Sequence, residues 1–381
     1  SFKASAQQAV NYDESKVPDL ILPDLFVDTK GNRINSKEDW ESKRRPEILG
    51  IFTDYVYGQL PTDFDTQTFE EKLIYEHPHA EYARLKEVTI SVSRNSQSQD
   101  IRLKIYFPKN QEGPLPVFLL ISHRNVEQVT GNPENQFFPI KQIVSRGFAA
   151  AIFDVEDVSP DDKERYTHGI LNQLYPAQLG QPNGMRGLSA WAWGAIRAMD
   201  YFEKDPEIDE KRAAVVGHSR GGKAALWCGA NDERWAVTVA NESGCGGAAL
   251  SRRKFGETVE RINSNFPYWF TDEFKKFNGL EGQLPIDQHQ LIGLIAPRAV
   301  YVASAIEDKW ADPKGEYLSL KLGSRVFSEI YLKSISLPEE YNYSPHTLLQ
   351  KSAGYHLREG THDLIGYDWE KIMDFALLQF E

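Results

Sequence analysis

Residues 214–230 read AVVGHSRGGKAALWCGA, and the middle of this stretch decides the fold. An apolar run typical of a buried strand stops at the turn G-H-S-R-G and continues as a helix-forming segment. A serine in such a turn, with a strand before it and a helix after it, matches the G-x-S-x-G nucleophile elbow. The elbow strains the backbone of its serine and needs small neighbours, which here are Gly217, Gly221 and Gly222. We therefore expect Ser219 to be a nucleophile at the edge of a sheet.

The segments around this motif alternate between short apolar runs and helical patterns. Strands are expected at 116–122, 148–157, 213–217, 235–243 and 296–308. Helices are expected at 188–204, 223–230 and 368–380. Alternation of this kind requires crossover connections, so the strands form a largely parallel sheet with helices on both faces. The predicted fold class is α/β, a three-layer sandwich.

Two earlier segments follow a different pattern. Residues 87–95 and 100–108 alternate polar and apolar side chains, which predicts an antiparallel pair of strands with one face toward solvent. The central sheet is therefore expected to be mostly parallel, with an antiparallel N-terminal portion. No internal repeat or linker divides the 381 residues, so a single domain is the simplest organisation.

The N-terminal segment, residues 1–84, is polar and contains many prolines. We expect it to wrap the core of the same domain, residues 85–381. One helix is predicted in it, at 37–60, where Pro46 marks a break or a first helical turn because proline lacks the N–H that a helix interior needs.

The charge of the chain excludes some partners. The 43 basic and 55 acidic residues give a net charge of −12, which opposes attraction to nucleic acid or to an anionic membrane. No apolar run approaches the roughly 20 residues of a membrane-spanning helix. We expect neither a nucleic-acid nor a membrane partner, and we expect a monomer.

The N-terminus and the cysteines bear on the cellular compartment. The sequence starts SFKASAQQAV, without methionine and without a basic and apolar leader, so we expect a mature secreted or periplasmic protein whose signal peptide has been removed. Cys228 and Cys245 are the only cysteines, too few for a disulfide framework or a cysteine-based zinc site. Two buried thiols are expected, and a single bridge between them stays open.

A serine hydroxyl is a poor nucleophile at neutral pH, so a nearby imidazole must accept its proton. In this fold the imidazole follows the serine in the sequence, and the candidates are His289, His346, His356 and His362. His362 lies in REGTHDLIGYDWEK, a glycine-containing loop before the last helix, where the fold presents its base. We expect His362 to be the base, with His356 as the next candidate.

An acid must orient that imidazole, and two positions compete for this role. Glu242 ends the strand expected at 235–243, and Asp308, with Glu307 beside it, ends the strand expected at 296–308. The carboxyl ends of parallel strands meet at one edge of a sheet, so either carboxylate is placed to reach the imidazole. The sequence does not decide between Glu242 and Asp308.

Several stretches carry a family resemblance. The most similar are GHSRGGKAALW, NESGCGGAALSRRKFGE, INSNFPYWF, LPIDQHQLIGLIAPRAVYVASAIEDKWADPKGE and YHLREGTHDL. Together they resemble the glucuronoyl esterases of carbohydrate esterase family 15, particularly the bacterial members. The resemblance is dense over residues 185–380 and looser before them, and it implies an α/β-hydrolase fold.

The resemblance also implies a function. These esterases hydrolyse the ester between a glucuronate of xylan, often 4-O-methylated, and an alcohol of lignin, with no metal or cofactor. By resemblance Ser219 and His362 are nucleophile and base, and Glu242 and Asp308 match the acids of fungal and bacterial members. Arg220 matches an arginine that stabilises the oxyanion. The residues that match those gripping the glucuronate ring are Lys223, Glu257 and Trp310.

Two departures from the family pattern bear on the site. His218 stands where fungal members have a cysteine that forms a disulfide, so that bridge is absent. The segment SHRNVEQV after the strand at 116–122 lacks the Asn-Phe-x-Gly-Asn pattern of many relatives, which leaves the second oxyanion donor open. Two alternative functions are kept: an acetylxylan esterase or other carboxylesterase, and a carbohydrate-binding protein with no catalytic activity.

Overall fold

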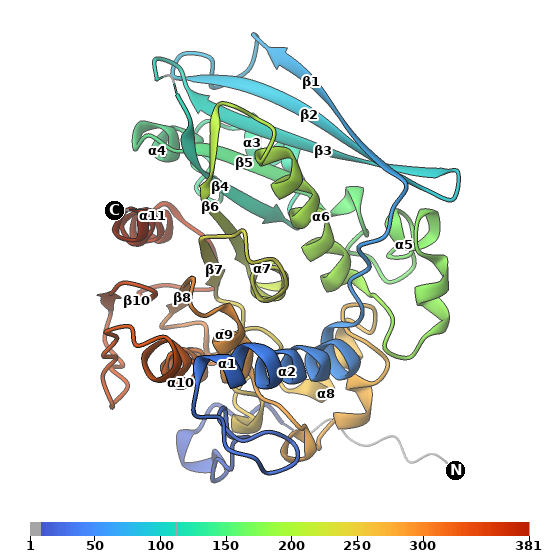
Figure 1. The fold of residues 1–381 in the computed structure, drawn as a ribbon. Coiled ribbons are helices and arrows are strands. Elements are labelled where there is room, and N and C mark those ends of the chain that lie inside the picture. The colour runs from blue at the N-terminus through green and yellow to red at the C-terminus, as the bar shows by residue number, and fades with distance from the viewer. Residues whose placement is uncertain (1–8, 112, 381) are drawn as a thin grey trace.

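The computed structural model describes residues 9–111 and 113–380, and its described strands form one ten-stranded sheet (Figure 1). The order across the sheet is β1-β2-β3-β5-β4-β6-β7-β8-β10-β9. The bounds are β1 (Thr66–Ile74), β2 (Ala83–Arg94), β3 (Gln97–Pro108), β4 (Leu115–Ser122), β5 (Ala149–Asp154), β6 (Ile208–His218), β7 (Val237–Asn241), β8 (Ala299–Ala305), β9 (His346–Leu349) and β10 (Ala353–Arg358).

The strand directions divide the sheet into two kinds of pairing. β5, β4, β6, β7, β8 and β10 run parallel to one another. β1, β2 and β3 form an antiparallel meander that joins the sheet through an antiparallel β3–β5 pair, and β9 pairs antiparallel with β10 at the other edge. The predicted mostly parallel sheet with an antiparallel N-terminal portion is therefore confirmed.

Helices cover both faces of the sheet, as the sequence predicts. One face packs against α3 (Val126–Gly131), α4 (Ile140–Ser145) and α11 (Gly366–Phe380). The other packs against α6 (Gly187–Phe202), α7 (Arg220–Asn231), α9 (Gln288–Ile295) and α10 (Pro313–Gly323). Each predicted strand and helix is present with shifted ends, whereas β1, β9 and β10 are additional. The three-layer arrangement is visible in Figure 1.

The central strand β4 shows why the layers form. All eight of its residues are buried, and all except Ser122 are apolar, so the strand does not alternate between polar and apolar side chains. Leu119 and Ile121 point into the larger core under α6 and α7, whereas Phe118 and Leu120 point into the core under α11. Side chains of consecutive residues project to opposite faces of a strand, so one strand anchors both cores.

The N-terminal helix continues past its proline. α1 (Lys37–Asp39), the wider π-helical turn η2 (Trp40–Arg44), α2 (Arg45–Phe52) and a second π-helical turn η3 (Thr53–Tyr57) follow one another. Pro46 lies in the first turn of α2, where its missing N–H costs little. Of the two expectations for Pro46, a first helical turn is correct, and the helix ends at Tyr57 before Gly58.

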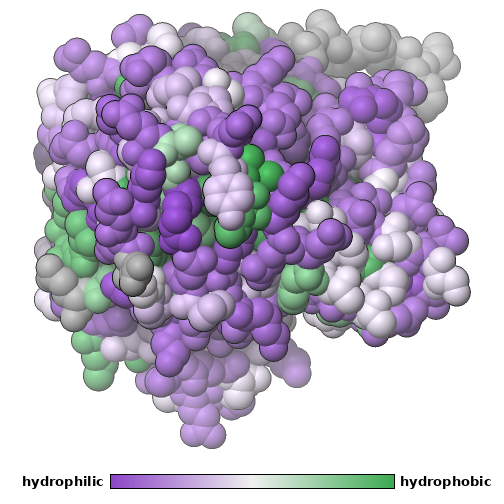
Figure 2. Space-filling view, turned by 90° about the horizontal axis from the view of Figure 1, so that it is seen from above, coloured by the Kyte–Doolittle hydropathy of each residue, from purple (hydrophilic) through white to green (hydrophobic). Residues whose placement is uncertain are grey.

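Two shorter helices and the surface complete the described chain. α5 (Ile170–Gln173) and α8 (Val259–Asn265) lie in the long connections on the α6 and α7 side. Seen from above, the surface is predominantly hydrophilic with small hydrophobic patches (Figure 2). Among the described helices, none has both the length and the apolar character needed to cross a membrane. Cys228 and Cys245 are buried free thiols, which answers the open question about a bridge.

A core substitution tests this packing. Leu119→Ala removes a fully buried side chain from the centre of β4 and should lower the free energy of unfolding by about 2–5 kcal/mol, because it leaves a cavity between sheet and helices. Urea denaturation followed by circular dichroism measures this loss. Leu73→Ala, on the edge strand β1 where the side chain is 50% exposed, is the control and should change stability by only about 0.5 kcal/mol. Equal losses would contradict the assigned core.

Candidate active site

Ser219 sits in the sharp turn between β6 and α7. Its backbone angles, φ 55° and ψ −123°, lie where few residues other than glycine are found, and its N–H donates to the carbonyl of Asn241 at 2.9 Å. A Cβ at Gly217 would lie 2.0 Å from the carbonyl oxygen of Gly221, so only glycine fits there. The local geometry is that of the predicted nucleophile elbow.

His362 lies in the loop between β10 and α11. Its Nδ1 is 2.6 Å from Oδ2 of Asp308 and 3.2 Å from Oε2 of Glu242. Both carboxylates are buried, whereas the His362 side chain is 40% exposed. Because both acids meet the ring at Nδ1, Nε2 is the nitrogen left to exchange a proton with another group.

The two carboxylates, called here the acid pair, have different surroundings. Asp308 makes the shorter contact with the imidazole, at the carboxyl end of β8. Glu242 follows β7 with a positive φ of 47°, and it accepts bonds from Arg358 at 2.6 Å and from the N–H of Asp363 at 3.0 Å. Asp308 is thus the principal partner of the ring, and Glu242 is shared with other donors.

The acid pair changes the electrostatics of the imidazole. Burial alone lowers the pKa of His362, but the hydrogen bond with Asp308 and the contact with Glu242 outweigh it and raise this pKa to about 9. Burial also raises the pKa of Glu242, although His362 and Arg358 oppose that shift. The imidazolium form of His362 is therefore strongly stabilised.

The other candidate histidines lie elsewhere. His289, on α9, bonds the carbonyl of Pro23, and His346, on β9, bonds that of Ser344. His356, on β10, is fully buried between Tyr301 and Asp368. Of the candidate bases, His362 is the one in contact with the acids at the strand ends.

The ring of His218 connects the serine turn to the histidine loop. His218 immediately precedes Ser219, and its ring centroid lies 4.5 Å from that of His362. No hydrogen bond joins Ser219 Oγ to His362 within the described residues, which is common before a substrate binds. The serine turn and the histidine loop are therefore neighbours through His218, and among the described residues the Ser219 hydroxyl has no hydrogen-bond partner.

Arg220 and Lys223 extend from the first turns of α7. Arg220 forms an ion pair with Asp161 and lies over the ring of Trp269, 4.7 Å from its centroid. Its Nε is buried and has no hydrogen-bond partner among the described residues. Lys223 is buried and donates to the carbonyl of Ser243, and burial lowers its pKa. Within the described residues, the Nε–H of Arg220 is therefore still available to donate a hydrogen bond.

Glu257 and Trp310 come from two separate loops and meet. The N–H of Glu257 donates to the carbonyl of Trp310 at 3.0 Å. Burial raises the pKa of Glu257, while the charges of Lys223 and Arg220 oppose the rise. Arg220, Lys223 and Glu257 therefore share one electrostatic environment, and Trp310 adjoins it through its backbone contact with Glu257.

Two further groups at the site were missed by the sequence analysis as functional residues. His123 and Arg124 follow β4; His123 Nδ1 is buried without a partner in the described chain, and Arg124 bonds Asp363 at 2.8 Å. Arg358 bonds Glu242 from β10. The departure from the family pattern after residue 122 was the sequence feature that pointed to His123 and Arg124. The feature that pointed to Arg358 was a charged residue in the otherwise mostly apolar run YHLR.

The same cluster has the composition of a metal site. Ligand atoms of Glu242, Asp308 and His362 lie within 4.8 Å of one another. Arg358 contacts Glu242, however, and its permanent positive charge opposes a cation at this position. The arrangement fits a hydrogen-bonded acid and imidazole better than a metal centre.

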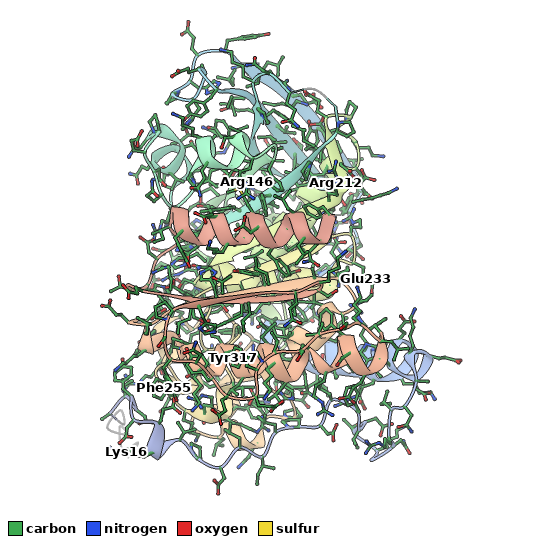
Figure 3. All side chains as sticks on the ribbon, turned by 90° about the vertical axis from the view of Figure 1, so that its left-hand side faces the viewer. Lys16, Arg146, Arg212, Glu233, Phe255 and Tyr317 are labelled. Atoms are coloured by element: carbon green, nitrogen blue, oxygen red, sulfur yellow. The ribbon has the colours of Figure 1, made fainter. Side chains whose placement is uncertain are left out.

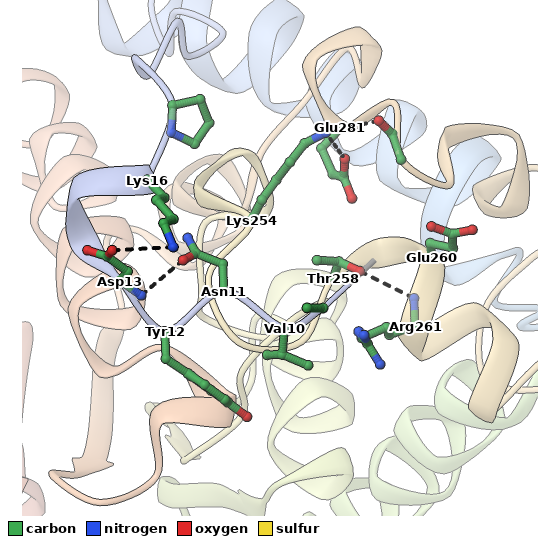
Figure 4. Close-up of a pocket in the computed structure, with 13 residues that line it drawn as sticks. Val10, Asn11, Tyr12, Asp13, Lys16, Lys254, Thr258, Glu260, Arg261 and Glu281 are labelled. Atoms are coloured by element: carbon green, nitrogen blue, oxygen red, sulfur yellow. Dashed lines mark hydrogen bonds and ion pairs between the residues drawn. The ribbon is translucent and has the colours of Figure 1, made fainter. Parts of the chain in front are cut away.

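A cavity of about 730 Å³ lies apart from these groups (Figure 4). The N-terminal segment lines one side of it through Asn11, Tyr12 and Lys16, and Lys254 and Thr258 line the other. Thr258 is adjacent in sequence to Glu257, so the cavity borders the loop that carries Glu257 without containing the serine or the imidazole.

Comparisons with known sequences agree on one family. A family model described as fungal glucuronyl esterase matches residues 90–330. The chain is 39% identical to carbohydrate esterase MZ0003 of an unknown prokaryotic organism, over 96% of this chain and 91% of that protein. It is 30% identical to a 4-O-methyl-glucuronoyl methylesterase of Podospora anserina over 76% of this chain, and the match spans 56% of that longer protein.

Solved structures give the same result. A glucuronoyl esterase from Solibacter usitatus is 34% identical and has a TM-score of 0.87, with 96% of this chain and 100% of that chain covered. A promiscuous CE15 esterase from a marine bacterial metagenome is 36% identical with a TM-score of 0.84, over 97% of this chain and 100% of that chain. Similarity extends over nearly the whole length in both cases.

The titration of His362 tests the acid pair without any substrate. In the wild type the ring should lose its proton only near pH 9, as measured by NMR of isotope-labelled histidine, with His362→Gln identifying the signal. Asp308→Asn removes the closest anion and should move the titration toward the ordinary value of about 6.5. A wild-type ring that titrates at or below that value would contradict the geometry.

Proposed function

Because the chain belongs to the glucuronyl esterase family, carbohydrate esterase family 15, we propose that it is a serine esterase acting on glucuronate esters, with Ser219 as nucleophile. The observation that carries the proposal is the cluster in which the strained serine turn, His362 and the acid pair meet at one edge of the sheet. Such a cluster has the parts of a serine hydrolase triad.

The reaction proceeds through an acyl-enzyme. Ser219 Oγ attacks the ester carbonyl carbon while its proton passes to Nε2 of His362, and Asp308 stabilises the imidazolium at Nδ1. The imidazolium returns the proton to the departing alcohol, which leaves the glucuronoyl group on Ser219. A water molecule then loses a proton to the same imidazole and attacks the acyl carbon. The bond between the acyl carbon and Ser219 Oγ breaks, the imidazolium returns the proton to Oγ, and glucuronic acid is released.

Arg220 is proposed to stabilise the oxyanion that forms in both steps. Its backbone N–H begins α7 beside the serine, and its unpartnered Nε–H is already desolvated, so little reorganisation is needed when charge develops. The ion pair with Asp161 is compatible with this role, because it holds the guanidinium in place.

Lys223, Glu257 and Trp310 are proposed to bind the sugar ring. An ammonium group donates to hydroxyls, a carboxylate accepts from them, and an indole offers a flat apolar face with one donor. The shared environment of Lys223 and Glu257 supports a single subsite. A small acetyl group does not need three such side chains, which disfavours an acetyl esterase.

The natural substrate is proposed to be the ester between a glucuronate of xylan, including 4-O-methylated forms, and an alcohol of lignin. The relative from Podospora anserina is named a 4-O-methyl-glucuronoyl methylesterase, which supports the acyl side. A polymer of this kind is found outside cells, so we propose a secreted or periplasmic location. The net charge of −12 does not favour an acidic polymer, so recognition depends on local contacts.

Hydrolysis of benzyl glucuronate tests the proposed function. The purified protein should release benzyl alcohol, and Ser219→Ala should reduce kcat by at least about 10⁴-fold because the nucleophile is lost. Liquid chromatography of the released alcohol measures the rate. Galacturonate benzyl ester and p-nitrophenyl acetate are the comparison substrates, and equal kcat/KM on all three would contradict the glucuronate specificity.

Lys223→Met tests the sugar subsite separately from the chemistry. The variant keeps the buried stem but loses the ammonium, so kcat/KM for benzyl glucuronate should fall by about 10- to 100-fold, the loss of one charged hydrogen bond. The rate with p-nitrophenyl acetate, which has no sugar, should stay within about threefold. Parallel losses on both substrates would indicate a role in the serine turn instead.

A further inference from the structure

A row of buried polar side chains leads from the interior to the acid pair. The Tyr301 hydroxyl meets Nδ1 of His356 at 2.8 Å, and Nε2 of His356 meets Oδ1 of Asp368 at 2.8 Å. Asp368 accepts from Nε of Arg358 at 2.8 Å, and Arg358 donates to Glu242 at 2.6 Å. We call these five residues the buried network. Each of them is at most 5% exposed.

The buried network also holds the backbone of the histidine loop. Arg358 donates to the carbonyls of Glu359 at 2.9 Å and of Asp363 at 2.8 Å. Glu242 accepts from the N–H of Asp363, and Asp368 accepts from that of Ile365 at 2.8 Å. Asp363 directly follows His362. Charged side chains therefore hold both the N–H and the carbonyl of the residue next to His362.

Stability alone does not account for this arrangement. Burying two carboxylates and a guanidinium carries a large desolvation cost, and apolar side chains of similar volume often give equal or greater stability. The charged groups instead fix the orientation of their neighbours. An arginine donates hydrogen bonds from a rigid planar guanidinium and holds several acceptors at once. The acceptors fixed here are Glu242 and the loop that carries the imidazole.

We propose that Arg358 and Asp368 are positioning residues for catalysis, which hold the His362 loop and Glu242 in register with Asp308. The inference rests on the proposed function, since it concerns the alignment of the proposed base. It places part of the catalytic support on β10 and on α11, two elements that contribute no reacting side chain.

The charged groups around the imidazole decide the direction of the pH effect. The groups that face His362 or Glu242, or act on their charge, are Asp308 after β8, His218 at the end of β6, Arg358 on β10, Glu316 on α10, Glu257 before α8 and His123 after β4. Arg124 acts on His123 and His218 rather than on the acid pair directly. Arg358→Met removes the permanent positive charge in contact with Glu242, so burial raises the pKa of Glu242 further and favours its neutral form. His362 then loses one of its two anions, and its pKa falls.

The experiment compares Arg358→Met, Arg358→Lys and Asp368→Asn with the wild type on benzyl glucuronate. Arg358→Met should lower kcat by about 10- to 100-fold with KM within about twofold, because the base is misaligned while sugar binding is unchanged. The acidic limb of the pH profile of kcat/KM should move to lower pH. Arg358→Lys should restore part of kcat, since it returns the charge without the fork, and Asp368→Asn should lower kcat in the same way.

Two controls separate positioning from general destabilisation. Lys86→Met breaks the buried 2.8 Å ion pair with Asp205 near the opposite edge of the sheet. Arg146→Met breaks a 2.9 Å ion pair with Asp374 on α11, the helix that carries Asp368 (Figure 3). Lys86→Met should lower the unfolding midpoint, and both controls should keep wild-type kcat and pH profile.

The outcomes distinguish this inference from the proposed function. If the folded Arg358 and Asp368 variants keep the wild-type kcat and acidic limb, the inference is wrong. If Arg358→Met does not fold, the Lys and Asn variants decide in the same way. If the wild type does not hydrolyse glucuronate esters, the proposed function fails, and the NMR titration of His362 in the same variants still reports whether Arg358 and Asp368 control that ring.

Discussion

Two carboxylates buried against one imidazole are the constraint on which the site depends. Two carboxylates this close repel each other unless cations lie beside them. The acid pair contacts His362 on one side and Arg358 on the other. Proton transfer to the imidazole is favoured because the two carboxylates beside the ring stabilise the cation that forms. In the proposed mechanism the serine turn needs no charge of its own, and it only has to bring one hydroxyl to this imidazole.

The parallel sheet makes this convergence possible. β6, β7, β8 and β10 end at one edge, and the loops that follow them carry Ser219, Glu242, Asp308 and His362 respectively. The buried strands fix the positions of these loops, because a core shared by both faces leaves little freedom for sliding. These four side chains are therefore placed by main-chain geometry first and adjusted by hydrogen bonds second.

Much of this was predictable from the sequence, and the limits have physical causes. The strand, turn and helix around Ser219 are local features with a strong pattern, and so is the loop of His362 before the last helix. The sequence indicated Glu242 and Asp308 as the candidate acids but did not decide between them. The two differ through the contacts of Glu242 with Arg358 and Asp363, and these contacts join residues more than 100 positions apart. β10 was missed since AGYHLR is short and carries two charged or polar residues that only the fold neutralises.

The loop after β4 has a separate consequence. His123 and Arg124 come from the connection after β4, and among the described residues neither makes a hydrogen bond to Glu242 or Asp308. Within the proposed function, substitutions in this loop should therefore change the surroundings of the substrate while the contacts between His362 and the acid pair stay in place. The surroundings of the substrate and the groups proposed to transfer the proton can then change independently of each other, since different connections of one sheet carry them.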